Sequence, residues 1–119
     1  MNKLENLSNF HGTGDYYTNP MYPFEWTDGV KYLVEDGGAY WLLDSIASWQ
    51  KESIIKSDQD LSQVQFWKLK VNPDNSAVLT CERDRDDVVI TQKIPFTDFP
   101  LEEITLYLCD GVLLLPSEY

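Results

Sequence analysis

The sequence predicts an α+β fold, with an antiparallel sheet of about four to five strands over residues 64–116 packed against two helices over residues 27–50. The first observation behind this prediction is a change of hydrophobic period, which is helical over residues 27–50 and alternating beyond residue 63. The second is a series of polar turn signals that separate the alternating runs. The third is the composition, because 119 residues, 43% of them hydrophobic, suit a single acidic globular domain over residues 1–119.

Residues 1–26 show neither period clearly. Glycine and proline interrupt both patterns in the segments His11-Gly12-Thr13-Gly14, Asn19-Pro20 and Tyr22-Pro23. The same stretch is rich in aromatic side chains, so we expect an irregular segment that wraps onto the domain along a sheet edge or along the helix pair.

A first helix is expected from Thr27 onward. The side chain of Thr27 or Asp28 can accept a hydrogen bond from a free amide of the first turn, and Gly37 can take the left-handed position after the last turn. A strand competes with this helix, because apolar and charged residues also alternate over residues 30–35. Asp28-Gly29 would then be a hairpin turn. We favour the helix.

A second helix is predicted over residues 39–49, where the apolar positions form one stripe: Ala39, Leu42, Leu43, Ile46 and Trp49. Residues 51–63 form a mostly polar stretch, and Ile54 and Ile55 within it either extend this helix or anchor a loop.

Three strands are expected next, over residues 66–71, 77–82 and 88–94. The turn signal Asn72-Pro73-Asp74-Asn75 and the charged residues 83–87 separate them, and such short connections indicate an antiparallel meander.

The last element is either a hairpin or a helix followed by a strand. Asp110-Gly111 between two apolar runs favours the hairpin, whereas a helix over residues 101–108 is the alternative. The two cysteines, Cys81 and Cys109, have no metal-ligand spacing, and both are expected to be small core residues.

The net charge is −11, from 20 acidic and nine basic residues, and the acidic excess is spread along the chain. This charge excludes a protein that binds nucleic acid directly by neutralising phosphates. No signal-peptide pattern begins the sequence, and the longest apolar run, residues 37–43, is far too short to span a membrane. We therefore expect a cytoplasmic protein without a membrane segment.

No stretch of the sequence resembles a known active site. His11 is the single histidine, so a metal or catalytic site would need it together with Asp15 and a distant carboxylate. The acidic residues Asp84, Asp86 and Asp87 alternate with arginines and lack the glycine of a calcium loop. The sequence thus predicts no catalytic residue, no metal and no cofactor.

Four residues are candidates for contact with a partner. Glu102 and Glu103 form an acidic pair whose side chains diverge, which suits a charged surface better than an acid–base pair. The large aromatic residues are expected mainly to fill the core, and in the alternative of a binding cleft Trp41 and Trp67 are its anchors.

Several short motifs resemble those of one family: Phe10-x-Gly12-Thr13, TDGVKYL at 27–33, GAYWLLD at 38–44, VLTC at 78–81, ITQ at 90–92, TDFPL at 97–101 and GVLLLPSEY at 111–119. This family is a set of small bacterial proteins, a domain of unknown function seen in cyanobacteria, plasmids and phages. The resemblance covers nearly the whole chain and carries no catalytic or binding residue over. It implies a mobile-element setting, in which small acidic proteins that block host defence or DNA-binding enzymes occur.

Three functional classes follow from these observations. The first is a non-enzymatic binding protein, such as an acidic inhibitor or nucleic-acid mimic, that engages a basic protein surface. The second is an enzyme that uses dispersed carboxylates or His11. The third is a structural or regulatory subunit that forms a homodimer through exposed aromatic residues.

Overall fold

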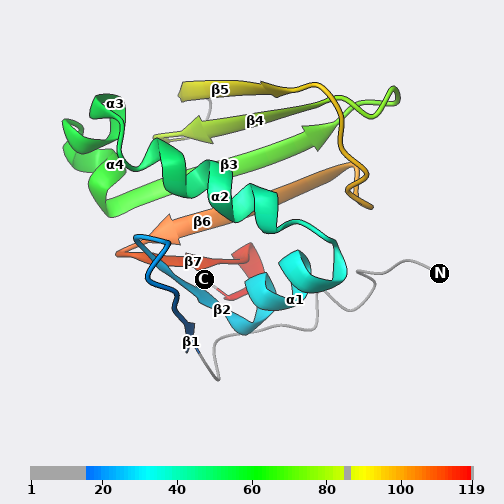
Figure 1. Ribbon diagram of the computed structural model, residues 1–119. Helices are drawn as coiled ribbons and strands as arrows, with labels where there is room; N and C mark the ends of the chain where they lie inside the picture. The colour runs from blue at the N-terminus through cyan, green and yellow to red at the C-terminus, as the bar shows by residue number, and fades with distance from the viewer. Residues whose placement is uncertain (1–15, 85–86, 119) are drawn as a thin grey trace.

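The computed structural model describes residues 16–84 and 87–118 (Figure 1). It is an α+β fold, as predicted, but the sheet is larger than expected and is mixed. Seven strands lie in the order β1-β2-β7-β6-β3-β4-β5, and helices α1 and α2 cross one face of this sheet (Figure 1).

The predicted meander is confirmed as β3 (Val64–Val71), β4 (Ala77–Glu82) and β5 (Val88–Ile94), with antiparallel pairing throughout. Asn75 has a φ of 68° in the β3–β4 turn, a left-handed conformation that asparagine tolerates well. Between Cys81 and Glu82 the register with β5 shifts at a β-bulge.

The hairpin is the correct alternative for the last element. β6 (Glu103–Cys109) pairs with β7 (Val112–Leu114), and Asp110 and Gly111 between them have φ values of 49° and 82°. Two successive residues with positive φ match the right-handed twist of the strands they join. β6 also pairs antiparallel with β3, which places the hairpin beside the meander.

Two strands lie within the segment that was expected to be irregular. β1 (Tyr16–Tyr17) pairs antiparallel with β2 (Glu25–Thr27), and β2 pairs in parallel with β7. The expected sheet of four to five antiparallel strands was therefore incomplete. Strands of two and three residues are too short to show a period of their own, and the partner of β2 lies near the other end of the chain.

Helix α1 (Asp28–Asp36) is the predicted first helix. The Thr27 hydroxyl caps it by accepting a hydrogen bond from the Val30 amide over 3.4 Å. The prediction for Gly37 was wrong, because its φ is −87° and Gly38, with a φ of 62°, takes the left-handed conformation instead. The last turn thus ends one residue later than the pattern suggested.

Helix α2 (Tyr40–Trp49) is the predicted second helix and packs its apolar stripe onto the sheet. Two short helices follow that were not predicted, α3 (Ser53–Lys56) and α4 (Gln59–Gln63). Ile55 anchors α3 in the core at 4% exposure, whereas Ile54 beside it is 42% exposed. Four-residue and five-residue helices bury one apolar side chain each here, so no helical stripe reveals them.

The core lies between the helices and one face of the sheet. Its side chains include Leu42, Leu43 and Ile46 from α2 and Trp67, Leu69 and Leu79 from the sheet, all at most 1% exposed. Cys81 is fully buried in this core, as predicted. Cys109 is half-buried instead, because its place in β6 directs it to the opposite face of the sheet.

A turn of 3-10 helix, η2 (Pro116–Glu118), follows β7 and contacts the start of α1 through hydrogen bonds. The buried Glu118 carboxylate accepts hydrogen bonds from the Thr27 hydroxyl over 2.6 Å and from the Gly29 amide over 3.2 Å. It also accepts one from the Leu115 amide over 3.0 Å. No helix in the described parts of the chain is long and apolar enough to cross a membrane.

Candidate acidic surface on the helix side

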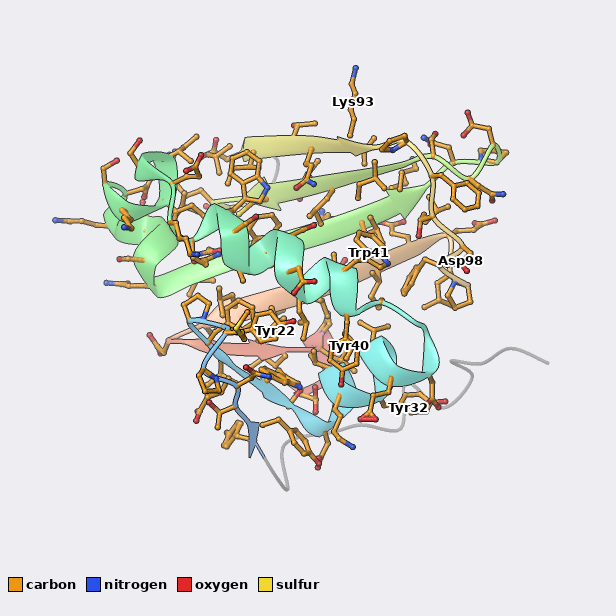
Figure 2. The ribbon with its side chains drawn as sticks, in the orientation of Figure 1. Tyr22, Tyr32, Tyr40, Trp41, Lys93 and Asp98 are labelled. Atoms are coloured by element: carbon orange, nitrogen blue, oxygen red, sulfur yellow. The ribbon has the colours of Figure 1, made fainter. Side chains whose placement is uncertain are left out.

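The two long helices carry four carboxylates and a single lysine. The carboxylates are Asp28, Glu35, Asp36 and Asp44, and all but the half-buried Asp28 are exposed. Tyrosines from β1, the β1–β2 connection, α1 and α2 lie among them: Tyr17, Tyr22, Tyr32 and Tyr40. We call these eight residues the acidic–aromatic surface; Figure 2 shows Tyr22, Tyr32 and Tyr40 on the helix side.

The end of the surface over α1 is organised by Lys31. Its ammonium group lies 2.9 Å from the Glu35 carboxylate and 5.1 Å from the centre of the Tyr17 ring. The Glu35 carboxylate raises the pKa of Lys31, which keeps the ammonium group charged. Because this is the one cation of the two helices, the Asp28 and Asp36 carboxylates keep a local negative excess.

A shallow groove of about 290 Å³ runs along α1 at this end, lined by Tyr17, Asp28, Lys31, Tyr32, Glu35 and Asp36. The Tyr17 hydroxyl donates a hydrogen bond of 2.7 Å to the Asp28 carboxylate, so the aromatic wall of the groove is held against the helix. The groove offers tyrosine rings and carboxylates together, which is the combination that attracts an ammonium or guanidinium group.

The end of the surface over α2 is organised by Tyr22 and Asp44. The Tyr22 hydroxyl donates a hydrogen bond of 2.6 Å to the Asp44 carboxylate. This bond raises the pKa of Tyr22 to about 12, with smaller contributions from burial and from the negative charge of Asp44. The Tyr22 ring also packs against the rings of Phe24 and Trp26, which further restricts the position of the phenol.

The partner residues expected from the sequence do not lie together on this surface. Trp41 is half-buried at the start of α2, on the other flank of that helix from Tyr22 and Tyr40 (Figure 2). Trp67 is 1% exposed in the core and donates a hydrogen bond to Gln65, so it offers no surface to a partner.

Glu102 and Glu103 are exposed at the start of β6, beside a hollow of about 470 Å³ between the β3–β4 turn and the segment before β6. Their local charge is less negative than that of the helices, because Lys70 is directly opposite Glu103 in the sheet register. The carboxylates of α1 and α2 were not among the candidate residues that the sequence indicated. The signal that could have identified them is the count of charges within each predicted helix, which the even spread along the whole chain conceals.

Other predicted sites give no further candidate. His11, Asp15 and the glycines between them lie outside the described residues, as does Asp86 of the charged turn. Within residues 16–84 and 87–118, no group of three or more His, Cys, Asp or Glu side chains could hold a metal ion. Arg83 forms ion pairs with Asp58 and Asp87, which assigns these carboxylates to structural contacts.

Comparison with other proteins places the chain in one family. Neither the search of curated proteins nor the search of solved structures finds a match. The model of one family covers residues 1–119, and its description reads Family of unknown function (DUF6876). This agrees with the expected resemblance to a domain of unknown function, and the chain belongs to that family.

Proposed function

We propose that this protein is a non-enzymatic binding protein whose acidic–aromatic surface engages a basic protein partner. The observation that carries the proposal is the charge of the helix pair, where four carboxylates accompany one lysine that is already paired with Glu35. A basic partner can add contacts to these carboxylates without displacing a cation from most of them.

The aromatic residues strengthen this choice of partner. Tyrosine rings present large contact areas at low conformational cost, and they attract cations through their faces. Tyr17 and Tyr22 are held in place by hydrogen bonds to Asp28 and Asp44, so little ordering is required when a partner docks.

The kind of basic surface follows from the rest of the chain. A net charge of −11 attracts a basic groove over long range and speeds association, and salt weakens that attraction. A groove that normally holds nucleic acid is the basic surface most suited to this charge. The protein would then act as an acidic inhibitor or nucleic-acid mimic, in keeping with the mobile-element setting that the family resemblance implies, and would not itself contact DNA or RNA at physiological salt.

The test is capture of partners from the host extract with the full chain as bait, identified by mass spectrometry. We expect a basic protein that is retained at low salt and released near roughly 0.5 M salt, where the screening length is only a few Å. Failure to recover a basic partner, or binding that is indifferent to salt, would contradict the proposal.

Three charge-reversal pairs then locate the surface. Glu35→Lys with Asp36→Lys should slow association by roughly tenfold, because it reverses exposed charge at the end of α1. Glu102→Lys with Glu103→Lys tests the acidic pair that the sequence indicated. The control is Glu52→Lys with Asp60→Lys, two exposed positions outside both clusters with the same change in net charge.

The pattern among the pairs is informative. An effect of the α1 pair alone supports the acidic–aromatic surface, whereas an effect of the β6 pair alone transfers the site to Glu102 and Glu103. An equal effect of all three pairs would show that only net charge matters, and would contradict a defined surface.

A further inference from the structure

The two edges of the sheet differ in length. One edge is β1, with two residues, and the other is β5, with seven. Among the described residues only β4 pairs with β5, so the outer edge of β5 carries backbone N–H and C=O groups that no described strand engages (Figure 1). Groups of this kind can pair with a strand of another chain.

Contacts with the helix layer hold β5 in place. The Ile90 side chain is 3% exposed in the core, and the Gln92 carboxamide accepts a hydrogen bond of 2.8 Å from the Trp49 indole. The outer edge is therefore already ordered in an extended conformation. Pairing with a second strand would lose little conformational entropy on this side of the contact.

The composition of β5 is typical of segments that pair with copies of themselves. Five of its seven residues are β-branched, and it contains neither proline nor glycine. Its single charged group is the ammonium group of Lys93. Without that lysine, no charge within β5 would oppose the pairing of two such strands.

Lys93 lies where it can oppose this pairing. Its side chain is exposed and extends from β5 away from the rest of the molecule (Figure 2). No described residue forms an ion pair or a hydrogen bond with its ammonium group, whereas Lys31 is paired with Glu35. Lys93 therefore makes no polar contact that stabilises the described fold.

A second feature of β5 also disfavours a flat partner strand. Cys81 is opposite Ile90 and Glu82 is opposite Val88, so Val89 is an extra residue in β5. A β-bulge of this kind bends the strand and increases its twist, which is one way in which proteins protect the edge of a sheet.

We infer that Lys93, together with the bulge at Val89, keeps the β5 edge of one molecule from pairing with the β5 edge of a second copy. Such pairing would be antiparallel about a two-fold axis, and it would place two lysines in one short interface. Both ammonium groups would lose water there and repel each other. This inference does not depend on the proposed function, because the acidic–aromatic surface contains no residue of β5.

The experiment compares Lys93→Thr with Lys70→Thr by sedimentation equilibrium of the full chain, at roughly 0.15 M salt. Lys70 is the matched control, because it is also exposed but belongs to β3, which is paired on both sides. Each variant loses one positive charge from a chain of net charge −11, so repulsion between whole molecules would reduce association of both equally. We expect Lys93→Thr alone to self-associate, at concentrations at least about tenfold lower than the wild type or Lys70→Thr.

A relocated lysine tests whether the charge on the edge is what matters. Lys93→Thr combined with Thr91→Lys restores the charge two residues away, at an exposed position on the same face of β5. This double variant should associate no more than the wild type. In Lys93→Thr, hydrogen exchange should show that the backbone amides of β5 become more protected as the protein concentration rises.

Circular dichroism confirms that each variant keeps the wild-type fold. Equal association of Lys93→Thr and Lys70→Thr would overturn the inference. It would also be overturned if the relocated lysine failed to suppress association, or if Lys93→Thr associated without any added protection in β5.

Discussion

The two faces of the sheet can be compared along a single strand, β3. Gln65, Trp67 and Leu69 point toward the helices and are at most 3% exposed. Val64, Phe66 and Lys68 alternate with them, point the other way and are half-buried. Neighbouring residues of one strand therefore differ in burial. Hydrophobicity alone does not distinguish the covered face from the open one, because both faces carry polar and apolar side chains.

The faces also differ in the polar groups that they hold. On the helix side the Gln65 and Gln50 amides exchange two hydrogen bonds of 2.8 Å, and Gln65 also accepts one from the Trp67 indole. On the open side Lys68 and Glu82 form an ion pair that is partly exposed to water. The buried amide network ties α2 to one particular register of β3, whereas the ion pair joins an exposed lysine to a carboxylate that is only 4% exposed.

The largest expected effect is the loss of stability when a charge is placed on the covered face of the sheet instead of the open face. Leu43→Asp or Ile46→Asp should prevent folding, because both side chains of α2 are fully buried in the core and an unpaired charge there costs several kcal/mol. Phe66→Asp, on the open face, should leave the fold intact with a melting temperature a few degrees lower. Circular dichroism melting checks all three variants, with Ser48→Asp on the exposed side of α2 as the control. Near-wild-type melting of Leu43→Asp would mean that α2 does not bury the face that carries Leu43.

The next largest effect is expected from the buried carboxylate of η2, which is hydrogen-bonded to the start of α1. Glu118→Ala should lower the free energy of unfolding by about 2–3 kcal/mol, because the Thr27 hydroxyl and the Gly29 and Leu115 amides lose a buried acceptor. Urea unfolding measures this change. Glu118→Gln, which retains an acceptor oxygen, should lose less, and the exposed Glu102→Ala should change little. Equal losses in Glu118→Ala and Glu102→Ala would contradict the role of the buried carboxylate.

The parts of this fold that the sequence predicts are those whose pattern is local. Each of these patterns can be recognised within a few residues. They are the alternation in β3, β4 and β5, the turn residue Asn75 and the pair Asp110-Gly111. The parallel pairing of β2 with β7 is not local, because a three-residue strand has no register until its distant partner is in place. Such pairing is settled by tertiary packing, which periodicity does not describe.

The candidate surface shows the same limit. Burial of Trp67 depends on which face of β3 the helices cover, and alternation in sequence leaves that choice open. The grouping of Tyr22 with Asp44 depends on how the segment before β2 is placed relative to α2, and that segment has no period. The acidic composition could be predicted to attract a basic partner, but the residues that concentrate the charge are brought together only by folding.

A smaller effect is expected where charge joins the helix layer to the end of β4. The amide of Leu61 and the Arg83 guanidinium lower the pKa of Asp58, which also caps α4. A depressed carboxyl pKa contributes stability above its unfolded value, near about 3.9, and this contribution is lost as the pH falls through the folded pKa. Asp58→Asn should therefore reduce the urea midpoint at neutral pH and make it less sensitive to acid. Asp74→Asn in the β3–β4 turn is the comparison, because the pKa of Asp74 is also lowered. If the urea midpoint of Asp58→Asn depends on acid as that of the wild type does, Asp58 is not the group responsible.

The smallest effect is a titration on the helix side. Tyr22 has a pKa raised to about 12 by its bond to Asp44, so its neutral phenol favours the folded state fully below about pH 10. That contribution is lost as the pH rises through about 12. The ultraviolet absorbance of tyrosinate, taken as the difference between wild type and Tyr22→Phe, isolates this group. Asp44→Asn should lower the Tyr22 pKa toward its ordinary value, whereas Asp36→Asn, which removes the same charge without a bond to Tyr22, should leave it unchanged. A basic partner that takes over the Asp44 carboxylate would compete with the phenol, so partner binding should also lower the Tyr22 pKa.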